Sequence, residues 1–446
     1  VNNLRALPLR ALHWRTIVAE SHLTLRCTDF MVSPLQANGF RNKFKMFRAF
    51  RYNDFRLFWL SGATQSIAQG MQFLTIGILV LDITSSSFQL GLVIFAYGIP
   101  NVVFSVLGGI IADRTDRLRL LISTRIAISI LILGLATLKV AGLLELWHVF
   151  AISSLLGAVQ AINNPSRMAL IGDLVERKDL MNGVALFSMV DQSGQIIGPA
   201  LSGLVIELFD LGTALFVNAG LYASGILFLV LIKSLPAISE IPKTAILIDL
   251  KKGLHCVWSS PILYTVIGLT FAFTFFAMSY RQVLPAFTEE VLSAGAGATG
   301  LLWMGAGLGS LIGNLILASL DDYKRKSLIL IGSLIAVCIF LALFAWSTWY
   351  WPSWIIFFFV GMASTGFFWP MANTLIQLNA PPELRGRIIS ILQVAPAIHF
   401  LSALPLALVG DTFSWPIAVT GAAVITLFVA LLLGVWNPTL RRSDSR

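Results

Sequence analysis

The chain has 446 residues, of which 57% are hydrophobic and only 12% are charged. A soluble domain carries about 25% charged residues, so this composition excludes an ordinary soluble protein and indicates a membrane protein. The formal net charge of +9 does not indicate a nucleic-acid partner, because the basic residues lie in short loops between long apolar segments.

Residues that could support catalysis or metal binding are scarce. Cys27, Cys256 and Cys338 lie far apart in the sequence and fit no metal-ligand or disulfide pattern. The sequence contains no Gly-Lys dipeptide, which excludes a Walker A phosphate loop and therefore an ATPase of that class. Since no nucleophile–base pair is evident either, we expect no enzyme activity, no metal and no cofactor.

The first segment, residues 1–45, is polar and basic. It lacks the apolar core of a secretory signal. We expect it to form a disordered cytoplasmic extension, with the membrane-embedded part beginning near Met46.

Twelve apolar segments follow, each near the length of about 20 residues that a helix needs to cross a bilayer. They predict an all-α integral membrane protein whose spans form an N-terminal half at 46–235 and a C-terminal half at 258–437. The remaining segments are then a cytoplasmic linker at 236–257 and a cytoplasmic tail at 438–446. The predicted spans are 57–81, 88–112, 119–141, 147–168, 182–207, 212–234, 261–286, 296–320, 327–347, 353–377, 387–409 and 414–436.

Lys and Arg gather in alternate loops, as cytoplasmic loops require. Arg114 and Arg117 lie in one such loop, and Arg167 is assigned with Arg177 to the next. The loops between them carry hardly any basic residues, so we expect both termini on the cytoplasmic side of a bacterial inner membrane. Arg125, one turn inside the third span, is expected to extend its charge toward the cytoplasmic surface.

Matching features recur at a nearly constant offset along the chain. Gly109 and Gly313 lie 204 residues apart, and Pro165 and Pro370 lie 205 apart. The shared offset predicts that the two halves are parallel repeats, an arrangement that is typical of transporters with a substrate site between the halves.

Residues 108–121, between the second and third spans, contain Gly109, Asp113, Arg114 and Arg117. This spacing resembles the signature loop of the major facilitator superfamily, Gly-x-x-x-Asp-Arg-x-Gly-Arg, with Asp116 in place of the second glycine. The resemblance implies twelve helices in two parallel six-helix halves. It also implies a gating role for the motif, in which Asp113 favours the state that is closed on the cytoplasmic side.

Three further motifs resemble a branch of that family. Gly198-Pro199 in the fifth span is similar to the Gly-Pro motif of exporters. The segments 163–167 and 383–387, together with Asn182, resemble the branch that contains enterobactin-type siderophore exporters and macrolide efflux pumps. That branch often has an arginine where this chain has Gln195, a difference that bears on the substrate more than on the fold.

Small residues recur every four positions in the fifth and eighth spans. Such stripes let helix backbones approach closely, and in the family these two spans meet across the halves. We therefore expect a seam on which the halves rock, made of Gly194, Gly198, Pro199, Ser202, Gly305, Gly309 and Gly313.

Polar residues inside the spans are the candidates for a central cavity, since polar groups in membrane helices face a cavity or a partner helix. Interhelical hydrogen bonding alone, worth about 0.6 kcal/mol per bond, remains the alternative. The candidates are Gln65, Gln69, Gln72, Gln192, Gln195, Tyr280, Arg281, Asn373, Gln393 and His399.

Asp191 is the candidate for proton coupling. It lies about ten residues into the fifth span, near mid-bilayer, where loss of hydration favours the protonated carboxyl. Arg281 lies at a different depth, so we do not expect the two to pair. The alternative is that Asp191 only forms hydrogen bonds with Gln195 or a neighbouring helix.

These features together predict an exporter of a small organic molecule, such as a siderophore, a macrolide or another amphiphile, driven by proton antiport. The expected partners are the substrate, protons and the lipid bilayer, and the chain is expected to be a monomer. An importer on the same scaffold and a membrane receptor or scaffold without transport remain the alternatives.

Overall fold

The computed structural model describes residues 45–233, 246–320, 325–382 and 384–435. The chain divides into two units, residues 1–46 and 47–446, and the membrane-spanning helices belong to the second. The predictions for residues 1–44, 236–245 and 438–446 lie outside the described residues.

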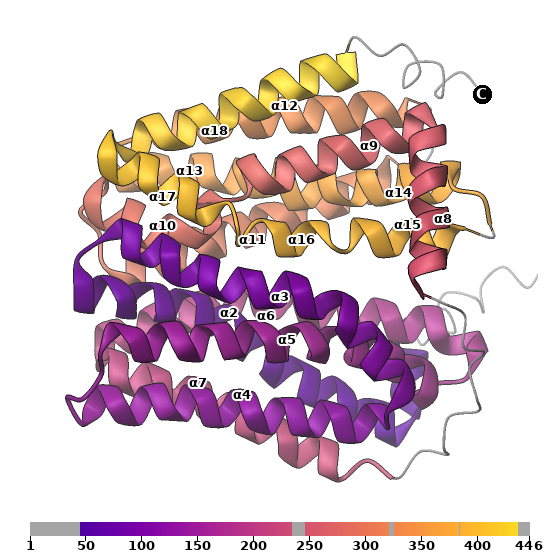
Figure 1. Ribbon diagram of the computed structural model, residues 1–446, viewed down its shortest axis with the longest axis horizontal. Coiled ribbons are helices and arrows are strands. Elements are labelled where there is room, and N and C mark those ends of the chain that lie inside the picture. Colours follow the sequence, from indigo (N-terminus) through magenta and orange to yellow (C-terminus); the bar gives the residue numbers. More distant parts are fainter. Residues whose placement is uncertain (1–44, 234–245, 321–324, 383, 436–446) are drawn as a thin grey trace, which may run out of the picture. The chain divides into compact units, whose positions relative to one another are not determined.

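The described residues form helices joined by short loops, and we call α2 to α7 the N-half (Figure 1). Each of its spans overlaps one of the first six predicted segments, with ends that differ by up to six residues. The elements are η1 (Lys45–Arg51), α2 (Asn53–Thr84), α3 (Ser87–Arg114), α4 (Arg117–Val140), α5 (Leu146–Leu174), η2 (Arg177–Asp179), α6 (Leu180–Leu208) and α7 (Leu211–Val230).

The helices from α9 to α18 form the C-half, and α8 precedes them. Four of its spans are irregular, because π-helical segments interrupt the first and fourth, turns break the fifth and a π-helical segment ends the sixth. The elements are α8 (Ile246–Ser259), α9 (Pro261–Ala272), η3 (Phe273–Ala277), α10 (Tyr280–Glu290), α11 (Ala296–Ser319), α12 (Lys326–Ala345), α13 (Tyr350–Gly361), η4 (Met362–Phe368), α14 (Trp369–Asn379), α15 (Arg385–Leu392), α16 (Ala395–Ile398), α17 (Ala403–Thr412), α18 (Trp415–Ala430) and η5 (Leu431–Val435).

Eleven helical segments among the described residues are long and apolar enough to cross a membrane. The remaining one of the twelve predicted spans, α6, is long enough at 29 residues but carries Asn182, Asp191, Gln192 and Gln195. It takes its place in the bundle between α2 and α11. The predicted all-α membrane architecture is therefore confirmed.

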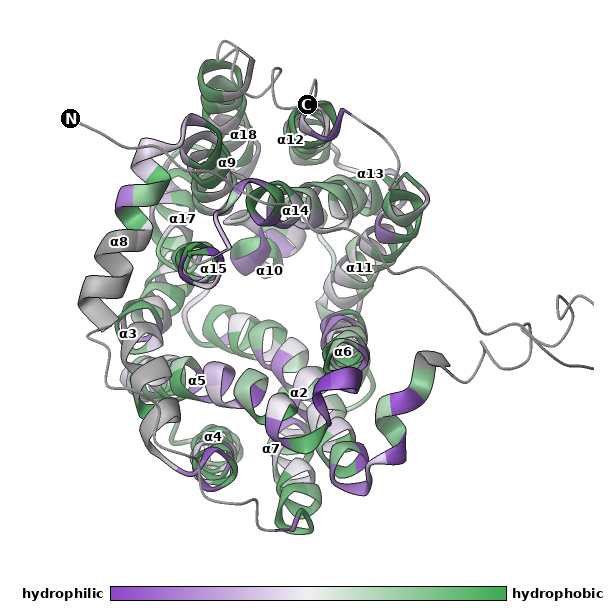
Figure 2. Ribbon diagram, turned by 90° about the vertical axis from the view of Figure 1, so that its right-hand side faces the viewer, coloured by the Kyte–Doolittle hydropathy of each residue, from purple (hydrophilic) through white to green (hydrophobic). Residues whose placement is uncertain are grey.

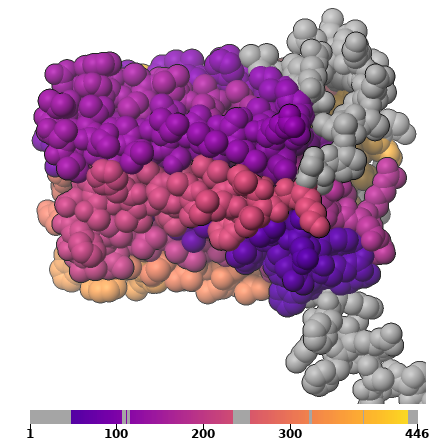
Figure 3. Space-filling view, turned by 90° about the horizontal axis from the view of Figure 1, so that it is seen from below, coloured from indigo at the N-terminus to yellow at the C-terminus, as the bar shows by residue number. Residues whose placement is uncertain are grey.

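The outer surface of the bundle is apolar. On α4 and α7, which pack side by side on the face seen in Figure 3, large exposed side chains include Ile130, Val140 and Leu227. Figure 2 shows the same pattern along the helices, with mostly hydrophobic ribbons at α4, α12 and α18. Such a surface is stable in lipid and unfavourable in water.

The two ends of the bundle differ. We call the end with loops 115–116 and 175–179 the basic end, and the end with loops 85–86 and 209–210 the distal end. Described contacts between the halves run from mid-helix to the distal end. Examples are Gly91 on α3 against Ala407 on α17, and Gly77 on α2 against Pro285 on α10.

The helices α6 and α11 lie side by side across the two halves, as the resemblance implies. They meet through Gly203, Gly300 and Gly307. A Cβ added at Gly300 would lie 2.5 Å from the Pro199 carbonyl oxygen, and one at Gly203 would lie 2.5 Å from that of Ala296. The Pro199 backbone therefore lies against α11.

The predicted glycine faces are wrong. Gly194 and Gly198 pack on Ser66 and Gly70 of α2, inside the N-half. The Ser202 hydroxyl likewise lies 2.8 Å from that of Thr75 on α2.

The stripe on α11 faces its own half as well. A Cβ added at Gly309 would overlap the Phe358 carbonyl oxygen on α13, while Gly305 packs on Trp354 and Gly313 on Met362. Each helix presents one small-residue face to its own half and another to the opposite half, and periodicity alone does not say which is which.

Candidate functional site

A buried arginine lies at the centre of the N-half. Arg125 on α4 is only 1% exposed, which corrects the prediction that it extends to the surface. Its Nη1 donates to the Ser61 carbonyl oxygen at 2.9 Å, and the guanidinium also contacts the Ser61 hydroxyl and Gln65 Oε1. The Arg125 guanidinium therefore finds its hydrogen-bond acceptors on α2 and does not need to reach the membrane surface for them.

Gln65 extends this network to a third helix. Its Nε2 donates to Asn163 Oδ1 on α5 at 2.7 Å, and Asn163 Nδ2 donates to the Thr124 hydroxyl at 2.8 Å. Gln65 is fully buried. Its amide is therefore used to join α2, α4 and α5, and does not face a cavity.

Asp191 on α6 has a charged partner that the sequence reasoning missed. Arg167 Nη2 lies 3.1 Å from Asp191 Oδ1, and the Ser66 hydroxyl donates to the same oxygen at 2.9 Å. Arg167 was assigned to a cytoplasmic loop, but α5 continues through it and its side chain is only 7% exposed. The guanidinium also stacks over the Phe187 ring, 5.1 Å from its centre.

The pair is asymmetric in its exposure and its bonding. The Asp191 side chain is 37% exposed, whereas Arg167 Nε and Nη1 are buried without a hydrogen-bond partner. Loss of the Asp191 charge would leave a buried cation without its counter-ion, which is costly in a low-dielectric interior. The position of Arg167 is therefore tied to that of the Asp191 carboxylate.

The signature loop lies at the basic end. The helix α3 ends at Arg114, and the Asp116 carboxylate caps α4 by accepting the backbone N–H groups of Leu118 and Arg119, both at 3.0 Å. Arg117 Nη1 donates to both carboxylate oxygens of Asp173 on α5, at 3.0 and 2.8 Å. Of Gly109, Asp113 and Arg114 only the backbone, which belongs to α3, is described.

A second cluster at the basic end joins the start of α2 to the loop before α6. The Asp179 side chain is 1% exposed, and it lies 2.7 Å from Arg51 and 3.3 Å from Arg48. The Tyr52 hydroxyl donates to it at 3.0 Å. On the exposed side, a hydrogen bond from Lys178 lowers the pKa of Glu176 below its usual value. This cluster was not predicted.

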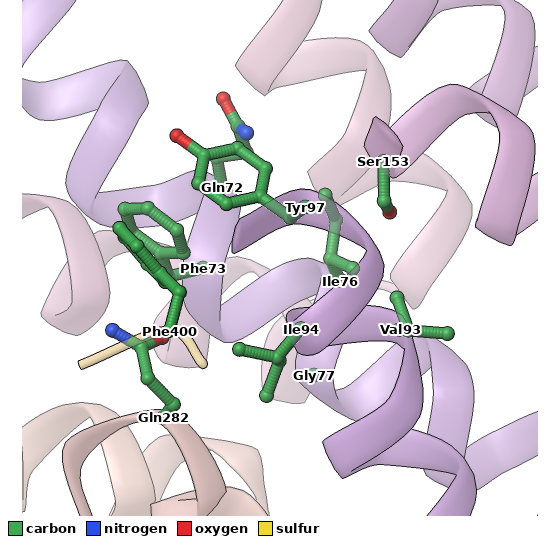
Figure 4. Close-up of a pocket in the computed structure, with 10 residues that line it drawn as sticks. All are labelled: Gln72, Phe73, Ile76, Gly77, Val93, Ile94, Tyr97, Ser153, Gln282 and Phe400. Carbon is green, nitrogen blue, oxygen red and sulfur yellow. The ribbon is translucent and has the colours of Figure 1, made fainter. Parts of the chain in front are cut away.

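A small pocket lies between the halves, nearer the distal end (Figure 4). From the N-half it is lined by Gln72 and Phe73 of α2, Tyr97 of α3 and Ser153 of α5, and from the C-half by Gln282 and Phe400. Four apolar residues complete the wall, namely Ile76, Gly77, Val93 and Ile94.

Few of the predicted cavity residues line this pocket. Gln72 does, and His399 bonds to the lining residue Gln282, with 2.7 Å between their nitrogens. Gln69 and Gln195 are half-buried, and Gln192 and Gln393 are exposed. None of these four residues lines the pocket.

The other candidates are held inside the C-half. The Tyr280 ring packs edge-on against Phe357, and the Arg281 guanidinium stacks over Trp303 at 4.9 Å. Asn373 donates to the backbone carbonyl of Trp369 at 3.0 Å.

The chain is similar to several known transporters. It is 24% identical over 353 residues to the staphyloferrin A transporter of Staphylococcus aureus (strain NCTC 8325 / PS 47), covering 75% of this chain and 84% of that one. It is 24% identical over 341 residues to the enterobactin exporter EntS of Escherichia coli O1:K1 / APEC, covering 75% and 79%.

A third relative matches over a shorter length. The uncharacterized MFS-type transporter YfiS of Bacillus subtilis (strain 168) is 25% identical over 185 residues, so the match spans 41% of this chain and 43% of YfiS. Among solved structures, a mutant of the nucleoside transporter NupG has a TM-score of 0.66 at 14% identity, covering 85% of this chain and 98% of that one. That likeness concerns the fold alone.

The sequence model of the Major Facilitator Superfamily matches residues 58–400. The match runs from α2 through the signature loop to the C-half, in agreement with the twelve spans and the meeting of α6 with α11. The chain belongs to the Major Facilitator Superfamily and is a multi-pass membrane transporter, not an enzyme.

Proposed function

We propose that this transporter exports a small organic molecule from a bacterial cytoplasm across the inner membrane in exchange for protons. The substrate class is a siderophore, a macrolide or another drug-like amphiphile. Support comes from the similarity to a siderophore transporter and a siderophore exporter over 75% of the chain, and from the Gly198-Pro199 motif in α6.

Asp191 is the proposed proton carrier, and the observation that carries this proposal is its ion pair with the buried Arg167. Because the carboxylate is partly exposed, a proton can reach it. Because the guanidinium is buried, Arg167 cannot lose its partner without rearranging. Proton binding is thereby coupled to a movement of α5 against α6.

The contacts between the halves support the interpretation that the structure is open toward the cytoplasm and closed toward the outside. With the basic end on the cytoplasmic side, the described seam contacts lie at the middle and outer side of the membrane. The proposed exchange of states then requires these contacts to separate while the signature loop closes the cytoplasmic side. In this scheme the halves at 46–235 and 258–437 move as bodies, with Asp113 favouring the outward state.

Transport by inside-out membrane vesicles tests the function. Vesicles from cells that express the chain would be offered a panel of siderophores and macrolides, with an acidic interior generated by respiration. We expect accumulation of at least one compound, abolished by a protonophore. Accumulation that survives the protonophore would contradict proton coupling, and accumulation in right-side-out vesicles alone would support the importer.

A further inference from the structure

Aromatic side chains from both halves line the pocket between them. The Phe400 ring lies 5.5 Å from that of Phe73 in a stacked arrangement and 4.8 Å from that of Tyr97 at a steep angle. Phe73 and Tyr97 themselves meet edge-on at 5.7 Å. Figure 4 shows the Phe73 and Phe400 rings lying against each other, with Tyr97 beside them. The C-half thus inserts one aromatic ring into a notch formed by α2 and α3.

The backbone accommodates this insertion through a glycine. A Cβ added at Gly98 on α3 would lie 2.7 Å from Phe400 Cβ. Phe400 follows α16 in the irregular stretch before α17, where the helix is broken by turns. In transporters, broken helices in the membrane mark substrate sites.

The notch also contains a hydrogen-bond donor with a fixed direction. Gln72 is 1% exposed, and its Oε1 accepts the Tyr222 hydroxyl at 2.8 Å. Tyr222 in turn accepts from Gln160 Nε2 at 3.1 Å. Because the Tyr222 proton is directed to Gln72, the amide nitrogen of Gln72 is left as a donor, and it has no partner.

Ser153 provides a second group of the same kind. It is 1% exposed, lines the same pocket, and its hydroxyl has no hydrogen-bond partner. Buried polar groups without a partner are rare in proteins, and each needs an explanation; two of them on the wall of one pocket are consistent with a ligand that binds there. The residues that line the pocket carry no charged side chain, so a charged ligand group would be left unpaired there.

We propose that the notch formed by Gln72, Phe73, Tyr97 and Ser153 is a substrate subsite for an uncharged aromatic ring that carries a hydrogen-bond acceptor. Phe400 occupies the ring position in the present state, and it leaves when the distal end opens. The substrate ring and Phe400 therefore compete for one place. This inference rests on the proposed export function and names the chemistry of one part of its substrate.

Direct binding to the purified full-length chain in lipid nanodiscs tests the subsite without requiring transport. The probe is benzamide, an uncharged ring with a carbonyl acceptor, and its dissociation constant is measured by ligand-observed NMR. Benzoate and cyclohexanecarboxamide are the matched controls for charge and for aromaticity. Removing the competing ring with Phe400→Ala should increase benzamide affinity several-fold and leave both controls weak.

Two further variants test whether the polar groups contribute to benzamide binding. In the Phe400→Ala background, Gln72→Met should lower benzamide affinity roughly fivefold, the value of one neutral hydrogen bond, and Ser153→Ala should lower it as well. Ser129→Ala is the matched control, since the Ser129 hydroxyl bonds the Ala219 carbonyl oxygen elsewhere in the N-half.

The outcomes are distinct from those of the vesicle assay. Unchanged benzamide binding in Phe400→Ala, or equal gains for cyclohexanecarboxamide, would overturn the subsite even if proton-driven export is found. Binding with the expected pattern would support the subsite even if the coupling ion proves to be another.

Discussion

Arg167 on α5 and Asp191 on α6 form an ion pair of 3.1 Å inside the N-half. The Ser66 hydroxyl of α2 donates to the same carboxylate oxygen, so three helices meet at one charge. Arg167 also stacks on Phe187. These contacts make Arg167 a positioning residue for the proposed proton carrier.

Substitution of Arg167 tests that positioning role. Arg167→Gln should abolish gradient-driven transport, because the carboxylate loses its counter-ion and its orientation. Arg167→Lys keeps the charge but lacks the planar fork, so we expect roughly a tenfold loss. Initial transport rates in proteoliposomes, normalised to reconstituted protein, provide the comparison. Equal rates for the Gln and Lys variants would contradict a role for the charge.

The contact between Arg125 and Gln65 should contribute to the free energy of unfolding. Arg125→Leu leaves Gln65 Oε1 without a donor, at a cost of about 1–3 kcal/mol for a buried group, whereas the Ser61 carbonyl keeps the Thr64 hydroxyl as a donor. Adding Gln65→Leu removes the orphaned acceptor. In a double-mutant cycle of unfolding in detergent, the double variant should therefore be less destabilised than the two single variants together. Strict additivity would mean that the two side chains do not interact.

The corrected seam predicts different effects for two glycines of α11. Gly300→Ala places a Cβ 2.5 Å from the Pro199 carbonyl oxygen of the other half, whereas Gly309→Ala places one in overlap with the Phe358 carbonyl oxygen of its own half. We expect Gly300→Ala to separate α6 from α11 and open the distal end. Gly309→Ala should lower the thermal stability without opening it.

Accessibility of Ser87→Cys at the distal end, in a chain freed of its native cysteines, reports the opening. Ser87 is 1% exposed and donates to Glu290 of the C-half. A membrane-impermeant thiol reagent should label it several-fold faster with Gly300→Ala than with Gly309→Ala. Identical labelling rates in the two backgrounds would remove Gly300 from the seam.

The signature loop offers a matched pair of carboxylates. Asp113→Asn should slow transport severely while membrane insertion stays normal, because the proposed outward state loses its charge contact. Asp116→Asn should change transport little, since asparagine caps a helix N-terminus about as well as aspartate. Transport rate and the amount of protein in the membrane are measured together. Normal turnover of the Asp113 variant would exclude a gating role.

The spans could be predicted from the sequence because membrane crossing depends on segment length and apolar composition. Even α6, which carries Asp191, Gln192 and Gln195, is predicted at 182–207 by its length and apolar content and is observed at Leu180–Leu208. The family could be predicted because Gly109, Asp113, Arg114 and Arg117 have a distinctive spacing. Neither prediction depends on which side of a helix faces which neighbour.

The site was harder to predict, because pairing depends on helix rotation and on depth. Arg167 looked like a loop residue, yet α5 runs seven residues beyond it to Leu174, and this length buries Arg167 beside Asp191. The glycine stripes on α6 and α11 were assigned to the wrong faces for the same reason. Phe400 lies more than 300 positions from both Phe73 and Tyr97, and no local pattern in the sequence predicts their contact.

The most direct test of the account is the response of Asp191→Asn to an imposed pH gradient. Purified wild-type and variant chains would be reconstituted in proteoliposomes with one substrate identified by the vesicle screen. Substrate counterflow without a gradient is measured beside gradient-driven accumulation. The account predicts that Asp191→Asn retains counterflow but gains nothing from the gradient, whereas the wild type accumulates substrate. Equal gradient-driven accumulation by the variant and the wild type would contradict it.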